Sequence, residues 1–365
     1  MARIDSNGRA VAALLAGSWR RSPPRLELPV ADLTRIAPLL LRSGAGALAW
    51  WRIRHSGYEL LPAELCQFRV TYLGYAARAA EYEAELIDSL TALRSSGIEP
   101  IVIKGWAVAR AYPESGLRPC GDIDLCLSAD QRVKAATIPS ARYLSSYSVD
   151  LDHDTVTRFG ERFETIYSRS QLVSLGCSEI RVPCPEDHLR ILCLHLLKHG
   201  AWRPLWLCDI AASLESRPQT FDWDRCLGTS TKYSDWVLCA ILLAHHLLGA
   251  DIGEIQSGRK SRTVPAWLVG SVLKQWNSSW AENLPTFAEQ VAGRLWTMET
   301  VRAMHRRWPN PIQATVDADG SFRSITRLQY QIRDCTLRAV KLCRQLPNLF
   351  AHSHDSMLND HGPQY

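Results

Sequence analysis

The stretch IVIKGWAVARAYPESGLRPCGDIDLCL, residues 101–127, decides the fold that the sequence predicts. It opens as a β-branched run, turns at a lysine and a glycine into a short helical pattern, and crosses a proline-rich loop. It closes as a strand in which Asp122 and Asp124 alternate with apolar residues. Positions i and i+2 of a strand share a face, so the two carboxylates are expected side by side. Such a pair is costly unless a cation lies between them.

A third carboxylate is expected on a neighbouring strand. Residues 130–138 have the pattern of a crossover helix and residues 147–152, YSVDLD, that of a strand, which makes the order β-α-β-α-β. Asp150 would complete an acidic triad, and Asp152, on the same strand face, is the alternative. Carboxylates on adjacent strands suit Mg²⁺, which prefers a few carboxylates together with substrate phosphates.

The lysine-glycine turn supplies candidate phosphate ligands. Gly105 follows the first strand, and a glycine there lets the backbone approach a phosphate at a helix N-terminus. Lys104 and Arg118 would meet a triphosphate as cations. Gly121, which directly precedes the acidic pair, is a further candidate.

The rest of the chain has mainly helical patterns, so the predicted class is α/β (α+β) with a small mixed sheet flanked by helices. Two further segments, FETIYSR at 163–169 and SEIRVP at 178–183, are expected to pair as strands. The predicted division is a helical region at 1–96, an α/β core at 97–183, a helical region at 184–350 and a flexible tail at 351–365.

Composition narrows the classes of function. A net charge of +5 is compatible with an anionic ligand such as a nucleotide and too weak for a dedicated nucleic-acid binder. The 11 cysteines are scattered without a CxxC pair, and no apolar run reaches membrane-spanning length. A cytoplasmic protein that does not associate with membranes is therefore expected.

The motif resembles a known family. The residues that carry it are Lys104, Gly105, Tyr112, Pro113, Arg118, Asp122, Ile123, Asp124 and Leu125. In this order they resemble the bacterial uncharacterised nucleotidyltransferase family, within the superfamily related to DNA polymerase β. The likeness covers roughly residues 30 to 215.

This resemblance implies a polymerase β-like core and transfer of a nucleoside monophosphate from an NTP, with ATP expected, to an acceptor. Pyrophosphate would be released, and the acceptor could be a small molecule, a peptide natural product or RNA. By the family pattern, Asp122 and Asp124 hold Mg²⁺ or Mn²⁺, while the third acid also acts as the general base.

Two departures from the family pattern keep an alternative open. Trp106 stands where a serine is usual, and the chain has DLDHD where relatives often have DLH. A catalytically degenerate module that binds a nucleotide or a partner is therefore the alternative function.

Three histidines have the spacing of zinc ligands. His195 and His199 are four residues apart, and His188 precedes His195 by seven. A zinc hydrolase is the less favoured alternative, because no glutamate completes an HExxH pattern. We expect His195 and His199 to line the cleft with Asp209, as candidates on the acceptor side.

Overall fold

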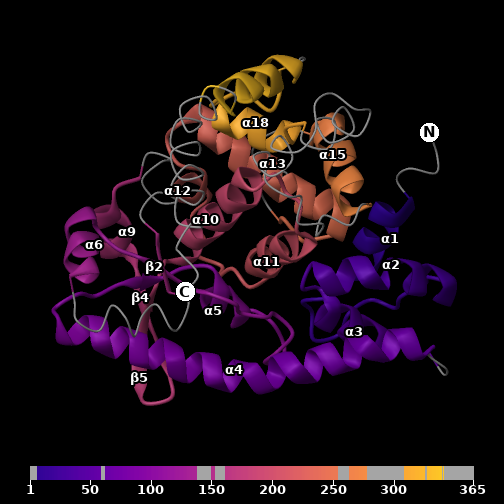
Figure 1. Ribbon diagram of the computed structural model, residues 1–365, viewed down its shortest axis with the longest axis horizontal. Helices are drawn as coiled ribbons and strands as arrows, with labels where there is room; N and C mark the ends of the chain where they lie inside the picture. The colour runs from indigo at the N-terminus through magenta and orange to yellow at the C-terminus, as the bar shows by residue number, and fades with distance from the viewer. Residues whose placement is uncertain are drawn as a thin grey trace, which may run out of the picture. The chain divides into compact units, whose positions relative to one another are not determined.

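The computed structural model describes residues 6–58, 62–137, 149–152, 161–253, 263–277, 308–324, 327–338 and 340. The chain divides into two compact units, residues 1–282 and 283–365. The first unit combines many helices with small sheets, which confirms the predicted α+β class (Figure 1).

Helices fill the N-terminal part, as the apolar periodicity predicts. They are α1 (Ser6–Leu15), α2 (Val30–Arg42), α3 (Gly46–Arg54) and α4 (Ala63–Ser95). The 33-residue α4 buries Leu86, Leu90 and Leu93, which recur every three to four residues along one face. The apolar face of this long helix packs against the central sheet (Figure 1).

The central sheet has the strand order β1-β2-β3, with β1 at Ile101–Val102, β2 at Ile123–Cys126 and β3 at Val149–Asp152. β1 runs antiparallel to β2, whereas β3 runs parallel to it. Short helices connect the strands: α5 (Gly105–Ala109) follows β1, and α6 (Ala129–Ala136) follows β2. The predicted β-α-β-α-β order is confirmed, and residues 147 and 148 of the expected third strand lie outside the described residues.

Each face of the sheet has its own apolar cover. Ile123 and Leu125 pack with the α4 side chains, on one side. Ile101 and Cys126 face the other way, toward α10 and α9. The alternation of β2 therefore places Asp124 on the same side of the strand as α9 and α10.

One predicted strand is wrong. Residues 163–169 form helix α9 (Phe163–Arg169), because Phe163 and Ile166, three residues apart, are buried on one side, a helical spacing. The strand expected at residues 178–183 is present as β5 (Ser178–Val182), but its partner is β4 (Gln171–Leu175). Together β4 and β5 form an antiparallel two-stranded sheet.

Helices also build the remainder of the first unit. They are α10 (Pro185–Lys198), α11 (Pro204–Glu215), α12 (Trp223–Leu227), α13 (Thr231–Leu248) and α15 (Ala266–Trp276). A proline opens both α10 and α11, where its missing N–H is not needed. Within the ranges given above, no helix combines the length and apolarity that a membrane span requires. The second unit contains α18 (Pro311–Asp317) and helical residues at 328–338 and 340.

Candidate functional site

Three aspartates meet where β2 and β3 begin. The parallel register sets Asp124 directly opposite Asp150, and Asp122 lies just before β2. Carboxylate oxygens of the three side chains all lie within 4.8 Å of one another. Asp122 and Asp150 are exposed, whereas Asp124 is buried at 8% exposure. The structure thus brings together the pair and the third acid expected on the neighbouring strand. Asp152 faces Cys126 in the register, and its side chain lies outside the described residues.

The buried member of this triad is held by Lys104. The Lys104 Nζ lies 2.7 Å from Oδ1 of Asp124, and both side chains are at most 10% exposed. Burial raises the pKa of Asp124 to about 6; Lys104 opposes this shift, and the neighbours Asp122 and Asp150 add to it. One ammonium group against three carboxylates leaves an oxygen-rich cluster with excess negative charge. Such a donor set fits a hard divalent cation such as Mg²⁺ or Mn²⁺.

The turn between β1 and α5 is conformationally unusual. Lys104 has φ of 53° and ψ of −142°, a region that a residue with a side chain rarely adopts. Gly105 follows with φ of 30°, and a Cβ there would lie 3.4 Å from Tyr82 Oη and 3.9 Å from Asp124 Oδ2. Strained backbone of this kind gathers at functional sites. The predicted phosphate-binding turn therefore lies against the acidic triad.

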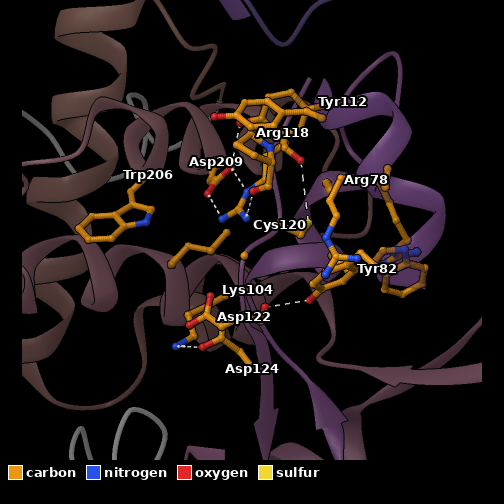
Figure 2. A pocket seen from close by; sticks show the side chains of 18 of the residues that line it. Arg78, Tyr82, Lys104, Tyr112, Arg118, Cys120, Asp122, Asp124, Trp206 and Asp209 are labelled. Carbon is orange, nitrogen blue, oxygen red and sulfur yellow. Dashed lines mark hydrogen bonds and ion pairs between the residues drawn. The ribbon is translucent and has the colours of Figure 1, made fainter. Parts of the chain in front are cut away.

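Hydrogen bonds connect helix α4 to the segments that carry the triad and the turn beside it. Tyr82 donates its hydroxyl to the carbonyl of Asp122 at 2.9 Å (Figure 2). Trp106, which stands in the usual serine position, is only 5% exposed, and its indole Nε1 donates to Glu83 of the same helix at 3.1 Å. The tryptophan thus ties α5 to α4.

A second ion pair is formed by Arg118, in the loop that leads to Asp122. Arg118 donates through Nε and Nη2 to Asp209 of α11, at 3.3 and 2.9 Å, and through Nη1 to the carbonyl of Pro119 (Figure 2). Tyr112 donates to the same carboxylate at 2.8 Å. Asp209 outweighs the cost of burial and raises the pKa of Arg118 above its ordinary value.

Their mutual contacts give Arg118 and Asp209 a structural role in addition to the predicted ones. Each nitrogen of the Arg118 guanidinium has a protein partner, and the Asp209 side chain is 1% exposed. Asp209 therefore fixes the loop through Arg118. A phosphate role for Arg118 and an acceptor role for Asp209 remain predictions.

A cavity of about 1000 Å³ opens over the triad. Its lining comes from α4, the segment from Lys104 to Asp124, α6, β3, α10 and α11. The predicted candidates Gly121, His195 and His199 all line it. The cavity is large enough for a ligand of nucleotide size, since ligand pockets usually measure about 300–1,000 Å³.

Two of the three histidines lie at this cavity. The rings of His195 and His199 are 4.5 Å apart between centroids, and Trp206 contacts both, at 4.7 and 5.3 Å. His188 is buried, and burial, followed by the charges of two arginines, lowers its pKa to about 3. In the described part of the chain, the group of three or more metal-ligating side chains is the aspartate triad. The histidines therefore give the zinc hypothesis no support.

Sequence reasoning missed some residues of this cavity. Arg203, Lys198 and Trp206 line its α10–α11 side. Arg203 donates through Nε to the carbonyl of Ser43, 160 residues earlier, at 2.7 Å. The segment GAWRPLW gives no local sign of that contact, because the partner comes from the loop between α2 and α3.

Comparison with known proteins gives one match. The profile of a protein family described as uncharacterised nucleotidyltransferase matches residues 29–138 and 139–249, which together are more than half of the chain. No curated protein and no solved structure matches the chain.

Proposed function

Because the chain belongs to the family of uncharacterised nucleotidyltransferases, we propose that it transfers a nucleoside monophosphate from an NTP to a hydroxyl or similar group of an acceptor. One observation carries this proposal: the three carboxylates of Asp122, Asp124 and Asp150 lie within 4.8 Å of one another at the floor of a large cavity. Three carboxylates this close together repel one another and destabilise the fold unless a bound ligand compensates their charge.

The triad would hold Mg²⁺ or Mn²⁺. Bound there, the ion would bind nucleotide phosphates and stabilise the charge that develops on the phosphoryl group under attack. Asp124 is held in place by the β2–β3 register, and Asp122 by the Tyr82 hydroxyl on its carbonyl. These supports keep the carboxylates together before any ligand arrives, which reduces the cost of organising the site.

Asp150 is the proposed general base. It is exposed to the cavity, unlike Asp124, so an acceptor hydroxyl can reach it. Asp150 takes the proton as the acceptor oxygen bonds to the α-phosphorus of the NTP. The bond from that phosphorus to the bridging oxygen of the β-phosphate breaks, and pyrophosphate leaves with that electron pair.

Lys104 and the turn that follows it would serve the phosphates. The ammonium group already lies at the triad, 2.7 Å from Asp124, and the α5 turn places backbone beside it. A short shift of the flexible lysine side chain would bring it to a phosphate oxygen, where a compact cation is effective. Positioning and electrostatic stabilisation would supply most of the rate enhancement.

The test is transfer of label from NTPs labelled at the α-phosphate to a panel of small-molecule, peptide and RNA acceptors. We expect label to move to an acceptor with release of pyrophosphate, and EDTA to abolish the transfer. Asp122→Asn should abolish it too, whereas Asp222→Asn, at the N-cap of α12 where the side chain is 44% exposed, should not. If labelled NTP binds with Mg²⁺ and no acceptor in a broad panel is modified, the degenerate binding module is the better account.

A further inference from the structure

One wall of the cavity is not used by the proposed nucleotide chemistry. It is formed by the last turn of α10 and the first turns of α11, and we call it the α10–α11 wall. Its members are His195, Lys198, His199, Arg203 and Trp206. The wall combines two cations with three rings, which is the composition of a site for a flat, negatively charged ligand.

Arg203 is held in a prepared position on this wall. Its Nε donates to the carbonyl of Ser43 at 2.7 Å, and its guanidinium lies 5.9 Å from the centre of the Trp206 ring. Gly44, at φ of 77°, makes room for it, because a Cβ there would lie 2.4 Å from Nη2. The Arg203 side chain is therefore oriented by segments of α2–α3 and α11 before any ligand binds.

The two cations of this wall differ from Lys104 and Arg118, which lie nearest to the acidic residues of the site. Lys104 is paired with Asp124, and Arg118 with Asp209. Among the residues that the structure describes, neither Lys198 nor Arg203 has a carboxylate within ion-pair distance. Partly buried cations without a counter-charge attract an anionic ligand group.

The α10–α11 wall lies close enough to the triad for charged groups of the reaction centre to shift the pKa values of its residues. Burial and Arg118 lower the pKa of Arg203, and Asp209 and Asp122 are among the groups that oppose the shift. Burial, Lys104 and Lys198 are among the causes that keep the pKa of His195 well below its ordinary value. His195 is therefore neutral near pH 7 and can accept a hydrogen bond from a ligand hydroxyl.

We propose that the α10–α11 wall binds the acceptor, and that this acceptor has a phosphate or carboxylate group next to a flat ring. The inference rests on the proposed function, because it names the substrate that receives the nucleotide. Arg203 and Lys198 bind the anionic group, while Trp206 and the two histidine rings contact the flat part. The reacting hydroxyl then lies toward Asp150, across the cavity.

The probe for this wall is phenyl phosphate, which combines one ring with one dianion. Its binding is measured by calorimetry on the full chain, first alone and then saturated with Mg²⁺ and an NTP analogue whose α–β bridge is methylene. We expect binding in both conditions. Benzoate and inorganic phosphate show which anion is preferred and whether the ring contributes, and phenol should bind far more weakly.

Variants identify the wall as the site. Arg203→Met and Lys198→Met should each weaken phenyl phosphate binding about 10- to 100-fold, the usual value of a charge-assisted hydrogen bond. Arg203→Lys keeps the charge and the fold but loses the planar fork, so we expect an intermediate loss. Arg9→Met, an exposed change of equal charge on α1, is the matched control and should change affinity less than twofold.

Three outcomes overturn the inference. One is phenyl phosphate binding that is equal in the parent and the Arg203→Met variant. Another is binding that the NTP analogue abolishes, because the wall would then hold the nucleotide itself. The third is phenol binding as tightly as phenyl phosphate.

Asp150→Asn separates this inference from the proposed function. It should remove metal-dependent nucleotide binding and leave phenyl phosphate binding unchanged. If the parent transfers no nucleotide to any acceptor but still binds phenyl phosphate through Arg203 and Lys198, the proposed function fails and the anion site stands. If transfer occurs and phenyl phosphate binds equally well to Arg203→Met, the inference fails and the function stands.

Discussion

Replacement of Asp209 by asparagine is expected to destabilise the protein by about 3–5 kcal/mol, the usual cost of breaking a buried ion pair. The carboxylate is 1% exposed and accepts from Arg118 at 2.9 and 3.3 Å and from Tyr112 at 2.8 Å. Asparagine keeps the shape, and its oxygen can still accept from Tyr112 and from Arg118 Nε, which share Oδ1. Its amide nitrogen takes the place of Oδ2 and meets Arg118 Nη2 donor to donor, and the guanidinium is left buried without a counter-charge. One lost charge-assisted hydrogen bond, at about 1.5–3 kcal/mol, together with the desolvation penalty of a buried cation left unpaired, gives a similar total.

The assay is urea denaturation of the full chain, followed by circular dichroism. The matched control is Asp222→Asn, which affects an exposed pair with Arg225, with side-chain exposures of 44% and 42%. Asparagine can still cap α12 there, and exposed pairs contribute about 0–1 kcal/mol, so the control should lose less than about 1 kcal/mol. A loss that small in Asp209→Asn as well would refute the role given to the pair. The double variant Arg118→Met, Asp209→Leu should recover part of the stability, since no charge is then left buried.

Two further predictions concern the triad. Lys104→Met should raise Mn²⁺ affinity about tenfold in the absence of nucleotide at pH 8.5, because a cation no longer competes for Asp124, and should weaken NTP binding. Equal Mn²⁺ affinity in parent and variant would count against this competition. Because the pKa of Asp124 is about 6 rather than 3.8, a proton should compete with the metal at a higher pH than at an ordinary carboxylate. Mn²⁺ affinity, measured by titration, should fall about tenfold per pH unit below pH 6, and a flat profile down to pH 5 would contradict this assignment.

Local patterns made the centre of the fold predictable. Ile123 and Leu125 alternate with the acids, and both are fully buried, so the period of two fixed which side of β2 faces α4. The neighbouring strand could be placed beside β2 because a crossover helix joins parallel strands. From these two features, the approach of Asp150 to Asp124 followed.

Contacts between distant segments were not predictable. Residues 163–169 are too short for periodicity alone to separate helix from strand, and packing against the sheet decides for the helix. Arg118 meets Asp209 across 91 positions, and Arg203 meets Ser43 across 160. Such pairs depend on how the helices dock, which no local pattern records. The contacts that fix the cavity walls therefore had to be taken from the structure, whereas the acidic floor and the place of His195 and His199 in the lining could be inferred from the sequence.

The most direct test of the central claim is a Mn²⁺ titration in the presence of an NTP analogue. The electron paramagnetic resonance signal of free Mn²⁺ reports how much of the ion is bound. The parent should bind Mn²⁺ stoichiometrically. Asp122→Asn, Asp124→Asn and Asp150→Asn should each weaken binding at least tenfold, because each removes one carboxylate of a cluster only 4.8 Å across. Unchanged Mn²⁺ affinity in all three variants would contradict the assignment of this triad as the metal and nucleotide site.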